Sequence, residues 1–327
     1  MKKVGLFFGG LGNEAEVSVV SAKNVAANID QEKYELILVY WHTDGAFYRV
    51  RDFDEIATPT ERIREQEFKH IFDVALPMTH GRFGEDGILQ ALFERLGVPY
   101  AGCRVLSSAL CMDKAVCKTF LSGQRIPQTR FKVIDFSLLA PAELEVKLEE
   151  IRQSFALPLF VKPANSGSSV GISKVEDMDE LPRAIAEARK HDTKIVIEEG
   201  LVGLREVEVG ILGNGHLIVS WPGELILSQE FYDYDEKYKN NRTEVRIPAR
   251  LPIGAEQEIM AMAQTVYRLC DCRGFARIDF FVANGKVYLN EINTLPGFTQ
   301  FSMYPLLLMK MGLSYGELVS RIIDLAY

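Results

Sequence analysis

Three oxygen-bearing side chains near the C-terminus, Asp279, Glu291 and Asn293, have the chemistry and spacing of a metal site. They lie in two stretches rich in β-branched and aromatic residues, separated by Asn284-Gly285, the strongest short signal for a β-hairpin. Side chains of a strand alternate between its faces, so a hairpin can gather these three on one face. Mg²⁺ prefers such all-oxygen ligands.

The length of the hairpin loop decides which residue lies opposite Asp279. Only a loop with an odd number of residues can bring the carboxylates together: a two-residue turn places Asn290 opposite Asp279, whereas a three-residue loop places Glu291 there. We predict the second pairing, because it brings the two carboxylates together. The alternative is an ordinary hairpin with one solvated polar face. The rigid Thr-Leu-Pro-Gly turn at 294–297, which directly follows the second strand, makes that alternative less favourable.

A lysine followed by a loop of small residues indicates phosphate binding. Lys162 ends the apolar stretch 159–162, and residues 165–171 read Asn-Ser-Gly-Ser-Ser-Val-Gly. Small residues let backbone N–H groups close over phosphates, and the lysine adds a positive charge. The segment is not a Walker A loop, which needs Gly-Lys-Ser/Thr at the start of a helix. A flexible surface loop is the alternative, and the metal site later in the chain favours nucleotide binding.

Two glycine-rich turns follow strands in the first hundred residues. The turn at 9–14 lacks the Gly-x-Gly-x-x-Gly spacing of NAD-binding folds, so we expect it to direct Glu14 toward another ligand. The turn at 80–87 begins with His80 and follows the strand predicted at 74–78. The carboxyl edge of such a sheet is where ligands bind, although a single histidine is more often structural.

Size and composition narrow the classes of protein. A chain of 327 residues predicts two or three domains, and its net charge of −8 argues against nucleic acid or a membrane as a partner. No apolar run is long enough to span a bilayer, and the first one stops at glycine, as a strand does, rather than continuing like a signal peptide. The five cysteines form no Cys-x-x-Cys pair, which favours reduced thiols and a cytoplasmic location.

The elements that must position these residues follow from hydrophobic periodicity. Strands and helices alternate over the first hundred residues, which predicts a parallel α/β layer, and later strands and helices predict α+β units. The predicted strands are 4–8, 34–40, 74–78, 159–162, 194–198, 206–212, 217–221, 276–282 and 287–292, and the predicted helices are 18–29, 88–96, 112–121, 255–270 and 315–326.

Taken together, these segments resemble the D-alanine–D-alanine ligases, an ATP-grasp family of peptidoglycan synthesis. The resemblance runs nearly end to end. It implies an α/β fold with an N-terminal Rossmann-like domain (1–102) and two ATP-grasp subdomains (103–201 and 202–327) that enclose ATP. The motifs that carry it are Gly9-Gly10…Glu14-x-Glu16-Val17-Ser18, His80-Gly81-x-x-Gly84-Glu85-Asp86-Gly87, Met112-Asp113-Lys114, Val161-Lys162-Pro163…Gly167-Ser168-Ser169-Val170-Gly171, Phe231-Tyr232-Asp233-Tyr234…Lys237-Tyr238 and Asn290-Glu291-Ile292-Asn293-Thr294-x-Pro296-Gly297-Phe298-Thr299…Ser302.

The resemblance implies a reaction in two stages. ATP phosphorylates the carboxylate of one D-alanine, and the amine of a second D-alanine then attacks the acylphosphate and displaces phosphate. Two Mg²⁺ ions, replaceable by Mn²⁺, would be held by Asp279, Glu291 and Asn293. The resemblance also implies a homodimer.

The family's motifs also imply roles for the remaining site residues. Those expected to contact ATP are Lys114, Lys162 and Lys237 at the phosphates and Glu198, Leu201 and Glu206 at adenine and ribose. Those expected around the amino acids are Glu14 and His80 at the first substrate, Arg277 and the Gly297 N–H at the oxyanion, Ser168 and Tyr238 at the closed site, and Ser302 and Met303 at the second substrate. The loop 231–238 would close over ATP.

Two departures from the family pattern are the glycine at position 12, where serine is usual, and the Glu199-Gly200 pair before Leu201, where some relatives have a lysine–aromatic pair. Tyr238 and Met303 favour D-alanine as the second substrate over D-lactate and D-serine. The alternatives are a ligase of another acceptor, a nucleotide sensor without catalysis, and an NAD-dependent dehydrogenase, which the glycine spacing disfavours.

Overall fold

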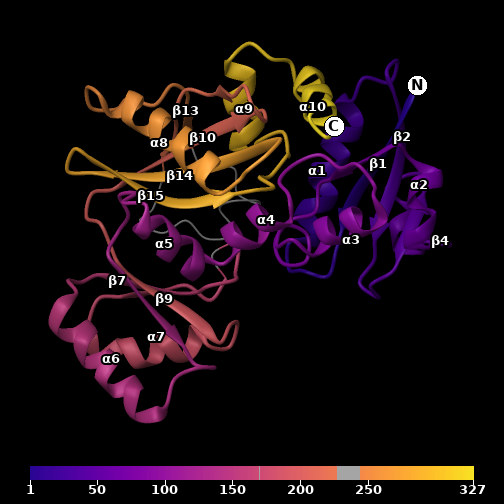
Figure 1. The fold of residues 1–327 in the computed structure, drawn as a ribbon. Helices are drawn as coiled ribbons and strands as arrows, with labels where there is room; N and C mark the ends of the chain where they lie inside the picture. The colour runs from indigo at the N-terminus through magenta and orange to yellow at the C-terminus, as the bar shows by residue number, and fades with distance from the viewer. Residues whose placement is uncertain (169, 227–243) are drawn as a thin grey trace.

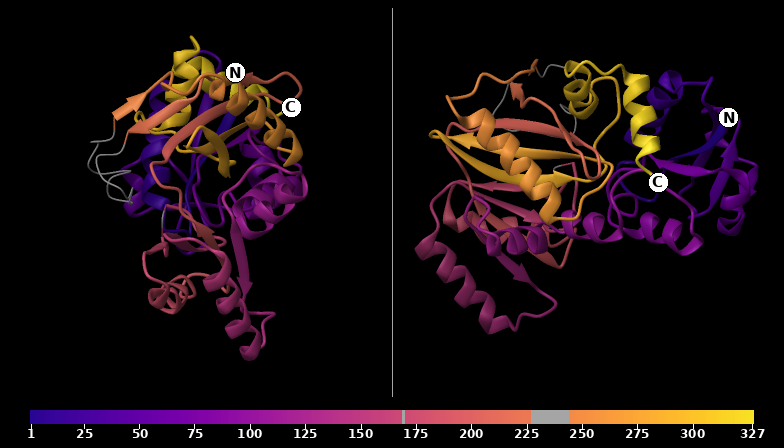
Figure 2. Two further views of the ribbon diagram at one scale, coloured as in Figure 1. Left: turned by 90° about the vertical axis from the view of Figure 1, so that its left-hand side faces the viewer. Right: turned by 45° about the horizontal axis from the view of Figure 1, so that its top comes forward.

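The computed structural model describes residues 1–168, 170–226 and 244–327. The described residues form three β-sheets, each built from one continuous part of the chain and covered by helices (Figure 1). The central sheet, with the helices that cover it, projects from the other two (Figure 2). Among the described helices, none has both the length and the apolar character needed to cross a bilayer.

The N-terminal sheet has the order β4-β3-β2-β1-β5. Strand β1 lies between β2 and β5 and runs parallel to both, as predicted, while β3 and β4 extend the other edge in antiparallel fashion. The layer is therefore mixed at one edge. Its strands are β1 (Lys2–Gly9), β2 (Tyr34–Trp41), β3 (Phe47–Val50), β4 (Glu61–Ile63) and β5 (Val74–Pro77), and its helices are α1 (Ala15–Asn28), α2 (Phe68–Ile71) and α3 (Ile88–Leu96).

Both faces of the N-terminal sheet are buried, which is why β1 reads as a continuous apolar run. Leu6 and Phe8 lie in one core with residues of α1 and of α10 (Tyr315–Asp324), and Phe7 lies in an aromatic core on the other face. The last helix of the chain thus packs beside α1 on the first domain (Figure 1).

The central sheet is antiparallel, with the order β6-β9-β7-β8, and one of its faces packs on two helices. Alternation along β7 and β9 puts Val161 and Ile197 into that core and leaves Lys162 and Glu198 on the opposite face. The elements are β6 (Phe131–Asp135), α6 (Pro141–Ser154), β7 (Leu159–Pro163), β8 (Ser173–Val175), α7 (Leu181–Ala188) and β9 (Lys194–Glu199).

The C-terminal sheet has the order β13-β12-β10-β14-β15, with β11 paired to β10. Apolar side chains of β10 and β14, such as Val209 and Ile278, form a core with helix α8, and the polar side chains of the same strands occupy the other face. The elements are β10 (Arg205–Leu212), β11 (Ile218–Val219), β12 (Gly223–Ile226), β13 (Glu244–Arg246), α8 (Ala255–Leu269), β14 (Phe275–Ala283), β15 (Lys286–Asn293) and α9 (Met303–Lys310).

The helix predicted at 112–121 is wrong as a single element. The chain forms α4 (Val105–Met112) and α5 (Lys114–Gly123), which are separated at Asp113. The Asp113 backbone is extended, and its carboxylate accepts a hydrogen bond from the Val116 N–H at 3.0 Å. An N-cap of this kind starts a new helix, so the chain changes direction just before Lys114.

Candidate functional site

A cavity of about 1170 Å³ is lined by residues of the central and C-terminal sheets and by Glu14, His80 and Glu85 from turns of the N-terminal region. Lys237 and Tyr238 lie outside the described residues, as does the loop 231–238. The cavity is lined by every other residue predicted for the site: Glu14, His80, Lys114, Lys162, Ser168, Glu198, Leu201, Glu206, Arg277, Asp279, Glu291, Asn293, Gly297, Ser302 and Met303.

The hairpin β14–β15 pairs Asp279 with Glu291, as predicted, but the pairing results from a β-bulge and not from the predicted three-residue loop. Ala283 pairs with Lys286, so the turn has two residues, and the register shifts at a bulge between Asp279 and Phe280. Phe280 lies opposite Leu289, which leaves Asn290 as the extra residue. The expectation that only a loop with an odd number of residues could bring the carboxylates together was therefore wrong.

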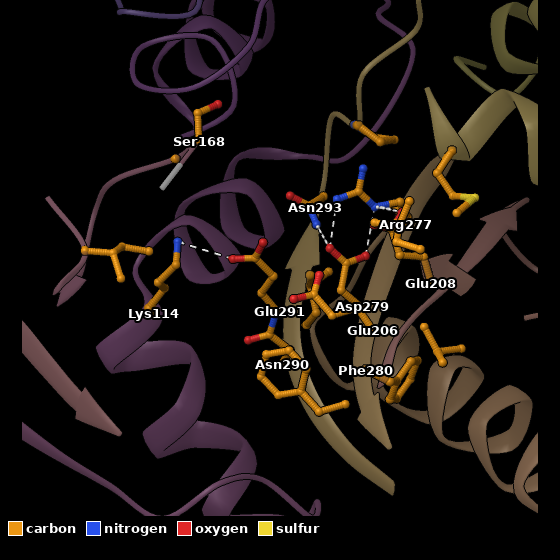
Figure 3. A pocket seen from close by; sticks show the side chains of 18 of the residues that line it. Lys114, Ser168, Glu206, Glu208, Arg277, Asp279, Phe280, Asn290, Glu291 and Asn293 are labelled. Atoms are coloured by element: carbon orange, nitrogen blue, oxygen red, sulfur yellow. Dashed lines mark hydrogen bonds and ion pairs between the residues drawn. The ribbon is translucent and has the colours of Figure 1, made fainter. Parts of the chain in front are cut away.

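Asp279 accepts hydrogen bonds from both Arg277 and Asn293 on the polar face of this sheet (Figure 3). The Arg277 guanidinium donates from Nε and Nη2 to the two Asp279 oxygens, each at 2.8 Å, and Asn293 Nδ2 donates to Asp279 Oδ2 at 2.9 Å. Glu208, opposite Asp279 on β10, is 2.8 Å from Arg277 Nε.

These partners hold the Arg277 charge in place. Burial opposes that charge, but Asp279 and Glu208 outweigh the effect and raise the Arg277 pKa well above its ordinary value. One guanidinium nitrogen points away from Asp279 (Figure 3). Asp279, Glu291 and Asn293 therefore form a set of hard oxygen donors beside one fixed cation, and such a set fits Mg²⁺.

Lys114 joins the hairpin to the loop of small residues. Its Nζ donates to the Ser166 carbonyl at 2.7 Å and lies 3.4 Å from Glu291 Oε2. Figure 3 shows Lys114 reaching from α5 toward Glu291, with Ser168 on the same side of the picture as Lys114. A cation at this point is placed to face phosphate oxygens and the metal ligands at once.

A buried cluster of opposite charges lies on the cleft side of the central sheet. Glu198 is 2.9 Å from Lys162 Nζ and 3.3 Å from Lys118 Nζ, and it accepts a hydrogen bond from the Thr129 hydroxyl at 2.9 Å. Burial disfavours the charge of Glu198, but the two lysines outweigh it and lower its pKa to about 2. Its carboxylate is already paired, so any contact of Glu198 with a nucleotide would come from its main chain.

Glu14 is held between two glycines and a serine. The Ser168 hydroxyl donates to Glu14 Oε1, although the two residues are 154 positions apart. A Cβ atom would lie 2.1 Å from Glu14 Oε2 if added at Gly81 and 2.8 Å if added at Gly167. Both approaches are too close for a side chain, so these glycines leave the space that Glu14 occupies.

His80 is buried and neutral. Its Nδ1 lies 3.1 Å from the Leu295 carbonyl, which can only accept, and its Nε2 lies 2.9 Å from the Ser21 hydroxyl. Nδ1 therefore carries the proton and Nε2 accepts from Ser21. Burial lowers the His80 pKa, which is consistent with a positioning role.

The turn that leads into α9 orders the predicted second-substrate residues. Ser302 Oγ accepts a hydrogen bond from the Thr299 N–H at 3.0 Å and lies 2.9 Å from the Thr299 hydroxyl. A Cβ added at Gly297 would lie 2.9 Å from Ser302 Oγ. Part of the Ser302 hydrogen-bonding capacity is therefore used by the turn.

At the first turn of the chain, a Cβ at Gly12 would lie 3.0 Å from the Arg82 carbonyl, so glycine suits that position.

Sequence reasoning assigned no role to three further charged residues of this region. Glu208 could have been found because it shares a strand face with Glu206, and Glu85 because it lies in the motif after His80. Burial, with a further contribution from Glu14, raises the pKa of Glu85 to about 8. Lys118 gave no signal, because its partner Glu198 is far away in the sequence.

Family models and individual relatives match the chain over nearly its whole length. The model described as "D-ala D-ala ligase N-terminus" matches residues 3–103, and "D-ala D-ala ligase C-terminus" matches residues 120–324. The D-alanine–D-alanine ligase of Caldicellulosiruptor bescii is 43% identical, covering 99% of this chain and 94% of that protein. The one from Streptococcus mutans is 42% identical, covering 98% and 95%.

Solved structures of similar proteins share the fold. The VanG D-Ala:D-Ser ligase from Enterococcus faecalis has a TM-score of 0.88 and 35% identity, covering 100% of this chain and 99% of that one. The D-alanine–D-alanine ligase from Coxiella burnetii has a TM-score of 0.83 and 30% identity, covering 99% and 93%. The three-sheet architecture described above is therefore the ATP-grasp fold.

Proposed function

The chain belongs to the D-alanine–D-alanine ligase family, and we propose that the cleft between its three sheets binds ATP and two D-alanine molecules. The protein is an ATP-dependent ligase that joins D-alanine to D-alanine, a reaction of cell-wall synthesis. The observation that carries the site assignment is the meeting of Glu14, Lys114 and the Asp279–Asn293 group around one cavity.

ATP would lie between the central and C-terminal sheets. Lys114 and Lys162 would face its phosphates, together with Lys237, and the backbone N–H groups of the loop 165–171 would close over them. Leu201, Glu206 and the main chain at Glu198 would contact adenine and ribose.

Asp279, Glu291 and Asn293 would hold Mg²⁺, two ions by the family pattern, with Mn²⁺ able to replace them. A bound divalent ion at this place offsets the negative charge of the phosphates. The protein's own part is to keep the ligands in register. The bulge at Asn290 puts both carboxylates on one face, and the hydrogen bonds of Arg277 and Asn293 fix the Asp279 rotamer.

The first D-alanine would place its ammonium group at Glu14, which Ser168 and the flanking glycines hold in position. Its carboxylate would then point toward Arg277. In the first stage it takes the γ-phosphoryl group of ATP, and in the second stage the amine of the other D-alanine attacks and phosphate leaves. Arg277 and the Gly297 N–H would stabilise the oxyanion that forms in between. The second substrate would lie near Ser302 and Met303, with Tyr238 closing the site.

We also propose the division of the chain into domains 1–102, 103–201 and 202–327, because each range contains one sheet and the helices that cover most of it. Three helices are exceptions, since α4 and α5 contribute to the core of the C-terminal sheet and the C-terminal helix α10 packs on the first domain. A homodimer in the cytoplasm is the assembly and location that we propose by family resemblance, and light scattering on the purified protein tests the dimer.

The test of the function is amino-acid-dependent ATP hydrolysis, followed by identification of the product by mass. Purified enzyme with ATP, MgCl₂ and D-alanine should release ADP and form D-alanyl-D-alanine. Parallel reactions with D-alanine plus D-serine or D-lactate measure acceptor selectivity. A mixed product formed in preference to D-alanyl-D-alanine would contradict the acceptor assignment, and ADP release that does not depend on D-alanine would contradict the ligase assignment.

A further inference from the structure

All five cysteines of the chain are buried, and they gather in one hydrophobic core although they come from distant segments. Cys111 is on α4, Cys117 is on α5 and Cys270 directly follows α8. None of them takes part in the reaction proposed above. The sequence contains no Cys-x-x-Cys pair, so the cluster exists only because α4 and α5 pack against the end of α8.

Three of these thiols have the geometry of a ligand set. The Sγ atoms of Cys111, Cys117 and Cys270 all lie within 4.8 Å of one another. Three sulfurs bound at about 2.3 Å to one Zn²⁺ ion would be roughly 3.8 to 4.0 Å apart, in tetrahedral or trigonal geometry. The sulfurs would thus have to approach one another by at most about 1 Å, which side-chain rotation can supply.

The surroundings suit an anionic metal–thiolate group. A divalent ion with three thiolates carries one net negative charge, and Lys118 follows Cys117 directly in α5. Cys111 also lines the large cavity, so an ion can reach the cluster from the cleft.

We propose that Cys111, Cys117 and Cys270 form a binding site for a soft, thiophilic divalent cation, for which Zn²⁺ is the reference ion. Binding releases three protons, one from each thiol, and forms three metal–sulfur bonds without any change of oxidation state. The site would be separate from the oxygen ligands proposed for Mg²⁺, because hard and soft ions prefer different donors.

An ion in this position would clamp α4 and α5 to the end of α8. Lys114 lies one turn before Cys117 on α5, and it is the residue that contacts both Ser166 and Glu291. Occupancy of the thiol site should therefore hold the helix that carries Lys114 against the C-terminal sheet. We expect thermal unfolding to shift to higher temperature with rising Zn²⁺ concentration, because only the folded chain presents the three sulfurs together.

The experiment uses the full-length protein, reduced and stripped of metal, then incubated with ZnCl₂ in excess MgCl₂ and desalted. Plasma mass spectrometry should find about one Zn²⁺ per chain, and X-ray absorption at the zinc edge should show about three sulfurs near 2.3 Å. Cys117→Ser should lose the sulfur signal and the thermal shift, and should bind Zn²⁺ at least about 10-fold more weakly. Cys103→Ser is the matched control, because Cys103 is equally buried, lies outside the trio and contacts the Arg273 carbonyl at 3.4 Å.

The spectrum of the wild-type protein decides the matter even if Cys117→Ser does not fold. Zinc bound only through oxygen or nitrogen, or no zinc retained in the presence of Mg²⁺, would overturn the proposal. Equal loss of zinc in Cys103→Ser and Cys117→Ser would also overturn it, since the effect would then come from damage to the core rather than from loss of a ligand.

Discussion

Replacing Glu198 by glutamine should destabilise the protein more than the same change at the neighbouring Glu199, because Glu198 is the more deeply buried of the two. Glutamine keeps the size of the side chain and can still accept from the Thr129 hydroxyl, but it removes the charge that faces Lys118 and Lys162. Lys118 is only 3% exposed, so it cannot turn to water when its partner is lost.

The size of the effect follows from the Glu198 pKa in the folded protein. A fall from an ordinary value of 4.5 to about 2 corresponds to about 3 kcal/mol of stability at neutral pH. Because the folded pKa is the lower one, this contribution is complete above pH 4.5 and is lost as the pH falls toward 2. Breaking a buried ion pair by removing one partner costs about 3–5 kcal/mol in general, which agrees.

The assay is thermal unfolding of the ligand-free protein at pH 7. For 327 residues, a loss of about 3 kcal/mol lowers the midpoint by roughly 4 °C if the whole chain unfolds together. Glu199→Gln is the control, because it makes the same change at the next residue, where the partner Arg130 is largely exposed; it should cost under about 1 kcal/mol. The double variant Lys118→Met, Glu198→Gln should lose less than the sum of the single variants.

An equal and small loss for Glu198→Gln and Glu199→Gln would refute the reasoning, because it would mean that water reaches Glu198 and screens its charge. Strict additivity in the double variant would refute it as well, since two charges that stabilise each other cannot be removed independently.

Three further predictions concern the cleft. Glu291→Gln should lower D-alanine-dependent ADP release by at least about 100-fold and leave the unfolding midpoint nearly unchanged. Mutating residues that only hydrogen-bond to metal ligands already lowers activity about 10–100-fold, and losing a direct ligand should lower it at least as much. Activity retained at saturating MgCl₂ would contradict the metal role. Gly167→Ala should lower kcat/KM for D-alanine by about 10-fold or more, because the added methyl group displaces Glu14. Gly123→Ala should not, because a Cβ added there meets no atom within 4 Å. Equal effects of the two substitutions would contradict the displacement of Glu14. The pKa of His80 is lowered in the folded protein, so the free energy of unfolding of the wild type should fall by up to about 1.4 kcal/mol per pH unit below pH 6.5. His80→Gln should remove that part of the pH dependence in unfolding experiments. An unchanged pH dependence would show that His80 is not buried as the neutral form.

Much of the fold could be predicted from the sequence because its signals are local. The alternation of side chains along a strand placed Asp279 with Glu291 and Asn293 on one face of a hairpin, and Ile278 lies in the core on the other face. The helix at 88–96 has the predicted bounds, since its apolar spacing and the closing Gly97 are contained in ten residues. Where a short polar residue caps its own backbone, as Asp113 does, the same local reasoning placed a helix but missed the break.

The sequence by itself determined which residues have the chemistry for the site and on which face of each strand they lie, because side-chain type and the two-residue period of a strand are properties of short segments. Only the tertiary structure decided how these residues meet. The bulge at Asn290 sets the register of Asp279 against Glu291, and Lys118 and Cys270 reach Glu198 and Cys117 from segments dozens of residues away. Register and long-range pairing depend on how whole elements pack, and that information is spread over the chain rather than contained in any one motif.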